Sequence, residues 1–161
     1  MNTASLNDIR TELKNASARQ LAEYCLRLAR YKKENKELLT YLLFDVENEP
    51  AYVAAIKEEI DEQFLSINLS NVYYAKKTLR KILRFVNRQV KYSGIPSTEI
   101  ESRIHFCKKI IESKVPLKNG SIISNLYSQQ LKKINSLVAK LPQDLQGDFD
   151  CDVKTVTDKR L

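Results

Sequence analysis

The sequence contains little of what several other architectures and activities need. Its 161 residues include only 3 glycines and 4 prolines, too few for the many turns of an all-β protein. The single histidine, His105, excludes a multi-histidine metal site and the paired Glu-x-x-His motifs of di-iron bundles within one chain. Glycine-rich phosphate loops and nucleophile-elbow motifs are also missing. These gaps argue against an enzyme, and the sequence predicts no catalytic residue, cofactor or metal.

Long apolar runs are missing too. The longest, residues 38–44, is far shorter than the roughly 20 residues that cross a bilayer. The polar N-terminal stretch lacks the basic start and apolar middle of a signal peptide. Cys25, Cys107 and Cys151 are odd in number, lie far apart and form no CxxC pair. We therefore expect free thiols in a soluble cytoplasmic protein without a membrane partner.

What the sequence does contain is helical periodicity. Apolar residues recur every three or four positions in seven segments that polar capping residues separate. The expected helices are residues 6–14, 18–32, 35–47, 49–67 and 70–93, a sixth helix capped by Thr98 and Glu101, and 121–141. This pattern predicts an all-α fold: a single compact bundle or short stack of about seven antiparallel helices, forming one domain over residues 1–141. The acidic tail, 142–161, loses the periodicity, and we expect it to be partly disordered.

The expected core is centred on the third segment. Residues 35–47 are apolar over most of the helix circumference, which is typical of a helix packed between neighbours. We therefore expect Leu42 in the core, so that Leu42→Asp would unfold the chain. Cys25 and Cys107 fall on apolar stripes and are expected to be buried, whereas Cys151 should be accessible in the tail.

Three strings of residues carry a resemblance. They are LRLARYKKENKELLTYLLFDVENEPAYVAAIKEEIDEQF at residues 26–64, YYAKKTLRKILR at 73–84 and NLYSQQLKKI at 125–134. Together they resemble an uncharacterised family of small all-helical bacterial proteins, a domain of unknown function. The resemblance implies one compact helical domain, and it transfers no functional residue because the strings contain no catalytic motif.

Charge is distributed unevenly along the chain. Residues 34–65 carry two basic and nine acidic side chains, a net of −7, whereas residues 66–141 carry fifteen basic and three acidic ones, a net of +12. No Asp or Glu occurs between Gln63 and Thr98. An acidic segment is therefore followed by a strongly basic one.

The basic residues of the fifth expected helix share one side. At 100° per residue, seven of them fall within an arc of about 140°, opposite the apolar stripe that contains Leu79, Ile82 and Val86. With the neighbouring Tyr73, they are the predicted partner-binding residues: Lys76, Lys77, Arg80, Lys81, Arg84, Arg88 and Lys91. Like charges four residues apart repel one another on a helix.

Several interpretations of this arc remain open. A docked helix must expose one face, and lysine keeps such a face soluble, but glutamates are usually mixed in. The preferred function is a non-enzymatic interaction module whose basic helix face binds an acidic protein surface. One such surface is this protein's own segment from Asp45 to Glu62, in the same or another copy. The alternative is sequence-independent binding of a nucleic-acid backbone, because no base-reading motif accompanies the arc.

Overall fold

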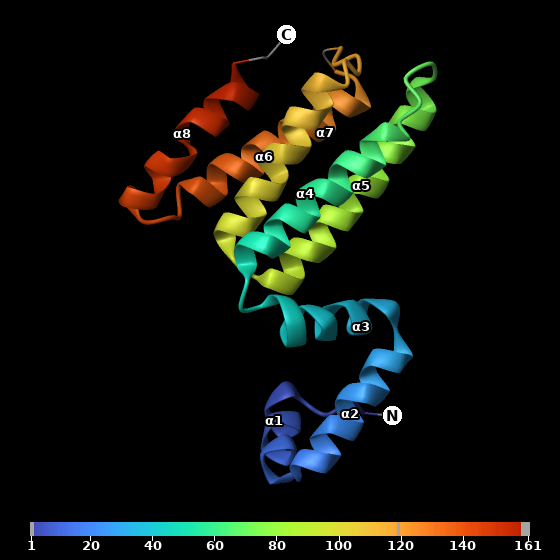
Figure 1. Cartoon of the computed structure of the whole chain (residues 1–161), viewed down its shortest axis with the longest axis vertical. Helices are drawn as coiled ribbons and strands as arrows, with labels where there is room; N and C mark the ends of the chain where they lie inside the picture. The colour runs from blue at the N-terminus through green and yellow to red at the C-terminus, as the bar shows by residue number, and fades with distance from the viewer. Residues whose placement is uncertain (1, 119, 159–161) are drawn as a thin grey trace. The chain divides into compact units, whose positions relative to one another are not determined.

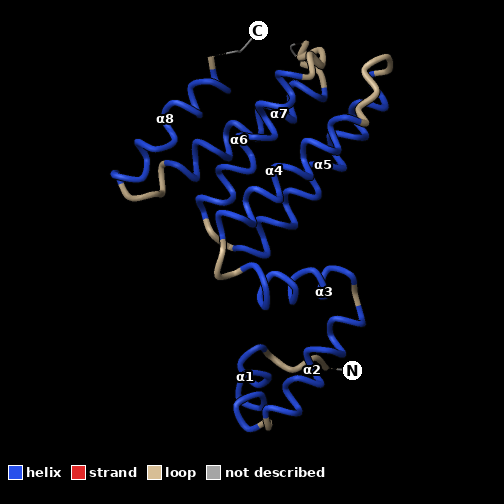
Figure 2. The backbone as a smooth tube through the Cα atoms, in the orientation of Figure 1, coloured by secondary structure: helices blue, strands red, loops and turns tan. Residues whose placement is uncertain are grey.

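Every regular element that the structure describes is helical, and the predicted all-α class is confirmed. The computed structural model describes residues 2–118 and 120–158, which contain eight α-helices and one π-helical turn (Figure 2). The chain divides into two compact units, Met1–Val46 and Glu47–Leu161. The sequence led us to expect one domain over residues 1–141. The division falls at the short connection before Asn48 and Pro50, where helical hydrogen bonding is interrupted.

Unit 1 is built from α1 (Leu6–Asn15), α2 (Ala18–Tyr31), α3 (Lys33–Thr40) and the π-helical turn η1 (Tyr41–Asp45). A capping box opens α2: Ser17 Oγ accepts a hydrogen bond from the Gln20 amide at 3.3 Å, and the Gln20 side chain accepts one from the Ser17 amide at 2.9 Å. Asn35 Nδ2 donates to the Leu28 carbonyl at 2.9 Å and so ties α3 to α2. The two helices form a hairpin (Figure 1).

The expectation of a central third helix is wrong for most of its apolar residues. The helix ends at Thr40 and continues as η1, and the side chains of Leu42, Leu43 and Phe44 are exposed by 50%, 63% and 76%. None of the residues in α1, α2 or α3 is buried. Apolar periodicity predicts that a segment is amphipathic, but it does not supply the neighbour that would cover it.

Unit 2 contains α4 (Glu49–Leu65), α5 (Val72–Ser93), α6 (Pro96–Glu112), α7 (Ile122–Val138) and α8 (Gln143–Thr157). Helix α6 is the centre of this unit, because it contacts each of the other four. Helices α4 and α5 lie side by side on one flank of α6, while α7 and α8 lie on the other (Figure 1). The unit is a bundle of helices of 15 to 22 residues.

Local sequence signals set most helix ends of unit 2. Asn48 caps α4, which has Pro50 in its first turn, and Gly94 ends α5 in the left-handed conformation with φ of 69°. The expected capping box of Thr98 and Glu101 is wrong, because α6 already begins at Pro96. Thr98 instead donates its hydroxyl to Glu49 at 2.5 Å, and Glu101 accepts from Lys57 at 2.7 Å.

The core of unit 2 is formed by the predicted apolar stripes. Each helix from α4 to α7 contributes several buried side chains, and the stripe of α5 is inaccessible at Leu79, Ile82 and Val86. Phe64 and Phe106 pack with ring centroids 5.9 Å apart between α4 and α6. Burying a large aliphatic side chain contributes roughly 1.5–3 kcal/mol, so these stripes account for the association of the helices.

The acidic C-terminal segment is helical over Gln143–Thr157 and packs on α6 and α7. Val156 is fully buried, and its carbonyl accepts a hydrogen bond from the Tyr127 hydroxyl at 2.5 Å. Lys108 of α6 pairs with Asp152 at 2.7 Å. This differs from the expected frayed tail, because a few apolar residues and one ion pair attach α8 although its periodicity is weak. The last three residues of the predicted tail lie outside the described residues.

The cysteines give a direct test of these assignments. Cys107 is buried, as predicted, and Cys151 is exposed, but Cys25 is exposed rather than in a core. Burial raises the pKa of Cys107 to about 12, although the positive charge of Arg103 lowers it by a smaller amount.

A mild alkylating reagent should therefore modify Cys25 and Cys151 in the native protein, and Cys107 only after unfolding. Peptide mapping by mass spectrometry, with and without denaturant, checks this order; fast native labelling of Cys107 would contradict it.

Candidate partner-binding surface

Helix α5 separates apolar and basic residues onto opposite sides. Its buried residues follow one another at intervals of three or four: Ala75, Leu79, Ile82, Val86 and Val90. We call its cationic side the basic face, consisting of Lys76, Lys77, Arg80, Lys81, Arg84, Arg88 and Lys91. Five of these seven side chains are exposed, whereas Lys76 and Arg88 are half-buried. The structure thus places the seven predicted cations together on one helix.

Few acids stand near the basic face. In the part of the chain that the structure describes, Lys77, Arg80, Lys81, Arg84 and Lys91 have no acidic side chain within ion-pairing distance. The three acids of residues 66–141 pair with cations that are not part of the face. Glu99 pairs with Lys133, Glu101 with Lys57 and Glu112 with Lys109, at 2.9, 2.7 and 3.1 Å. The charges of these five cations are therefore not offset by an acid within ion-pairing distance among the described residues.

An aromatic pair borders this face at the start of α5. The rings of Tyr73 and Tyr74 meet edge to face with centroids 5.5 Å apart, and they are 60% and 51% exposed. The Lys76 ammonium lies 5.2 Å from the Tyr73 ring centroid, within the range of a cation–π contact. Val72, the first residue of α5, is 59% exposed at this end of the helix. The sequence predicted Tyr73 as a binding residue but gave no sign of its pairing with Tyr74.

One carboxylate of the acidic segment Asp45 to Glu62, that of Asp61, already has partners within unit 2. Asp61 of α4 accepts a hydrogen bond from His105 of α6 at 2.7 Å and lies 3.4 Å from the Lys109 ammonium. Partial burial tends to raise the pKa of Asp61, but the contacts with His105 and Lys109 outweigh it, so its pKa lies below the ordinary value. Exposed carboxylates remain at Glu58 and Glu62. His105 is therefore a half-buried partner of a surface acid.

A buried arginine was not anticipated from the sequence. Arg103 of α6 is 1% exposed, and its guanidinium donates to Asn87 of α5 at 2.8 Å, to Gln130 of α7 at 2.6 Å and to Glu99 at 2.7 and 2.8 Å. Lys133 of α7 reaches the same Glu99 carboxylate at 2.9 Å. We call these five side chains the Arg103 network. It joins three helices next to the edge of the basic face, because Asn87 lies between Lys76 and Arg80 in angle around α5.

The Arg103 network lowers the pKa of Glu99. Burial of the carboxyl works in the opposite direction, but hydrogen bonds and charge from Lys133 and Arg103 outweigh it. The guanidinium donates from its planar set of N–H groups to three different acceptor side chains, because a buried arginine needs partners for its donors. Each of the three guanidinium nitrogens therefore has a partner, and the network connects α5, α6 and α7.

Other classes of site receive no structural support. Among the described residues, no group of three or more His, Cys, Asp or Glu side chains is arranged to hold a metal ion. Within the same residues, no helix combines the length and apolar character that a bilayer crossing needs. Comparison of the chain with protein-family models, curated proteins and solved structures finds no match. The resemblance noted for residues 26–64 therefore stays a prediction.

Proposed function

We propose that the protein is a non-enzymatic interaction module in which the basic face of α5 binds an acidic surface of a partner protein. The observation that carries this proposal is a row of exposed cations without opposing acids. Arg80 and Arg84, and likewise Lys77 and Lys81, are exposed and stand four residues apart, which is about 6 Å along the helix axis. Each such like-charge pair costs a few tenths of a kcal/mol in an isolated helix. An acidic partner would remove this cost and gain charge-assisted hydrogen bonds.

A second candidate function is binding to single-stranded nucleic acid. The exposed Tyr73–Tyr74 pair favours it, because bases stack on exposed aromatic rings beside a cationic groove. With four or five of the seven cations at phosphates, the logarithm of the affinity should fall with the logarithm of salt concentration at a slope near −3 for a single strand and −4 for a duplex. An acidic protein surface needs no contribution from the tyrosine rings.

The first test uses a fluorescent helical peptide of Glu and Ala at low salt, which has no large apolar side chain to bind the apolar surface of unit 1. Changing Arg80, Lys81 and Arg84 together to Gln should weaken its binding about tenfold, since each exposed ion pair contributes about 0.5 kcal/mol and 1.4 kcal/mol is tenfold. The matched control changes Lys118, Lys140 and Lys154 to Gln. These three are also exposed, so net charge falls equally, but binding should change less than twofold. Equal loss in both triple variants would show a general charge effect and contradict the proposal.

A labelled single-stranded oligonucleotide, titrated in parallel, separates the two candidates. Under the proposed function, Tyr73→Ala with Tyr74→Ala leaves peptide binding unchanged. The second candidate would be established by a different result. The oligonucleotide would bind tightly and the acidic peptide weakly, and the two tyrosine changes would weaken oligonucleotide binding by tenfold or more.

A further inference from the structure

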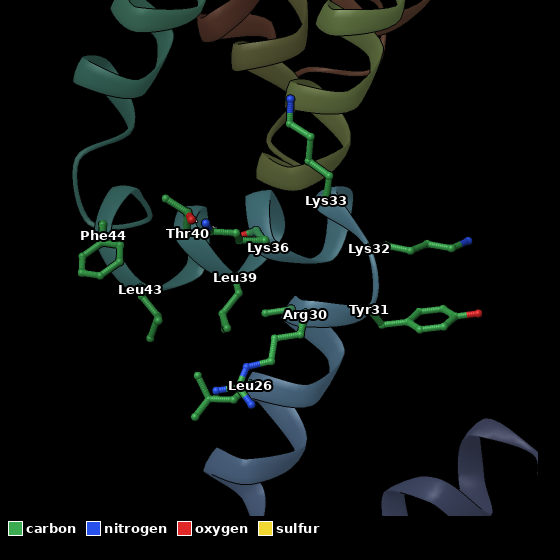
Figure 3. Close-up of a pocket in the computed structure, with 11 residues that line it drawn as sticks. Leu26, Arg30, Tyr31, Lys32, Lys33, Lys36, Leu39, Thr40, Leu43 and Phe44 are labelled. Carbon is green, nitrogen blue, oxygen red and sulfur yellow. Dashed lines mark hydrogen bonds between the residues drawn. The ribbon is translucent and has the colours of Figure 1, made fainter.

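Unit 1 contains a groove that is separate from the basic face. It has a volume of about 610 Å³ and lies between α2 and the segment formed by α3 and η1. Figure 3 shows Leu26 of α2 directed into the same space as Leu39 of α3 and Leu43 of η1, with Phe44 at its border. Leu26, Leu43 and Phe44 are more than half exposed. The floor of the groove is therefore apolar and open.

The π-helical turn explains part of this exposure. A π turn inserts one extra residue per turn and shifts the following side chains around the helix, and such turns often occur at functional sites. In η1 the consecutive residues Leu42, Leu43 and Phe44 are all exposed. Large apolar side chains gathered in this way on a soluble protein mark an interaction site.

The border of the groove is cationic. Four basic residues line it, and no acidic residue does: Arg30, Lys32, Lys33 and Lys36. The Arg30 side chain runs beside Leu26, whereas Tyr31, Lys32 and Lys33 point away from the floor (Figure 3). Lys33 has a distant contact with Glu37 at 3.5 Å, but Arg30 and Lys36 have no ion-pair partner among the described residues. An arginine beside an apolar floor suits bidentate binding of a carboxylate.

We propose that this groove binds an amphipathic acidic helix of a second protein. Two helices of unit 1 form the walls, and a third helix laid between them would cover Leu26, Leu39, Leu43 and Phe44 with apolar side chains spaced at i, i+3 or i+4 and i+7. Its flanking carboxylates would meet Arg30 and Lys36. The binding mode combines an apolar anchor with charge complementarity and does not depend on the function proposed for α5.

The chain's own exposed acidic helix faces fit the groove poorly. On α4, exposed Glu58 and Glu62 are accompanied by one large exposed apolar residue, Leu65. On α8, exposed Asp144 and Asp148 are accompanied only by Leu145. Neither face offers the two or three spaced apolar anchors that the floor requires. Helix α1 does expose Leu6, Ile9 and Leu13 at this spacing, but its exposed acids, Asp8 and Glu12, are balanced by Arg10 and Lys14, so it has no net acidic flank. The occupant is therefore assigned to another protein rather than to a second copy.

The test uses the full-length chain and three synthetic 18-residue helical probes with identical leucine spacing. Their flanking positions carry Glu, Gln or Lys, and binding is followed by fluorescence anisotropy. The Glu probe should bind most tightly and the Lys probe least. Leu26→Gln should weaken the Glu probe at least fivefold, and Arg30→Gln should weaken the Glu probe about fivefold but the Gln probe less than twofold. Both side chains are exposed, so circular dichroism should be unchanged.

Matched controls on the same unit are Leu6→Gln and Arg27→Gln, which change exposed residues outside the groove and should leave binding within twofold. At about 0.15 M salt, which screens purely ionic binding to the basic face, the triple variant of Arg80, Lys81 and Arg84 should retain the Glu-probe interaction, because the leucines anchor this probe in the groove. Failure of the Glu probe to bind, equal binding of the Lys probe, or loss of binding only in the α5 variant would overturn the proposal. Concentration-dependent dimerisation that Leu26→Gln abolishes would overturn it too, because a second copy would then occupy the groove.

Discussion

Ile82→Asp is expected to unfold the bundle formed by residues 47–158. Ile82 lies in the middle of α5 and is fully buried in the core. Losing a large aliphatic side chain from a packed core costs about 2–5 kcal/mol, and a buried unpaired carboxylate adds several more unless it takes up a proton. The sum is comparable to the 5–15 kcal/mol that stabilises a whole domain. Loss of the cooperative thermal transition in circular dichroism is the expected result.

The control for this variant lies on the same helix. Val72→Asp makes a similar exchange at the first residue of α5, where the side chain is 59% exposed and a carboxylate suits the helix N-terminus. Its melting temperature should stay close to that of the parent. If Ile82→Asp melted like Val72→Asp, then Ile82 would not lie in the core. Leu42→Asp, expected from the sequence to unfold the chain, should behave like Val72→Asp because the structure exposes Leu42.

Local signals in the sequence were sufficient for most of the helices. The capping residues Ser17, Asn48 and Ser121 and the terminator Gly94 act on their own neighbours, so a single stretch of sequence contains the whole cause. The burial of Cys107 and the exposure of the basic face were predicted for the same reason. Both follow from periodicity within one helix whose apolar stripe is actually covered.

The predictions that the structure contradicts concern burial and packing, which depend on a segment elsewhere in the chain. The apolar segment around Leu42 and the stripe containing Cys25 were expected to be buried, but periodicity cannot show that unit 1 provides no cover for them. Helix α8 shows the converse case. Its own pattern is weak, and Tyr127 and Lys108 from other helices attach it.

The Arg103 network is the clearest example of a feature hidden from the sequence. A charged residue is rarely buried without partners, and at Arg103 those partners come from α5, α6 and α7. The sequence reveals only that Glu99 and Arg103 are four residues apart on one helix, a spacing that normally indicates an ion pair exposed to solvent. The tertiary arrangement turns this pair into a buried connection between three helices.

Arg103→Ala should destabilise the bundle by about 3–5 kcal/mol, the usual cost of removing one partner from a buried ion pair. The change leaves a cavity and strands the Gln130 acceptor, which is itself buried. Lys133→Ala is the matched control, because Lys133 binds the same Glu99 carboxylate but is half exposed. An exposed ion pair contributes about 0–1 kcal/mol. Urea unfolding of both variants measures the contrast, and equal losses would show that burial does not strengthen the Arg103 contact.

The same network predicts a dependence on pH. Because the folded protein lowers the pKa of Glu99, the ionised carboxylate contributes stability that is present above its unfolded pKa, about 4.3. That contribution is lost as the pH falls from the unfolded pKa through the lower pKa of the folded protein.

Glu99→Gln removes the titration of this carboxyl and should flatten this part of the curve of stability against pH. Arg103→Ala should flatten it partly, since Lys133 still holds the carboxylate. Asp61, whose pKa is also lowered, titrates in every variant, so the difference between variants isolates Glu99. Parallel curves for the parent and Glu99→Gln below pH 5 would show that the network does not stabilise the ionised carboxylate.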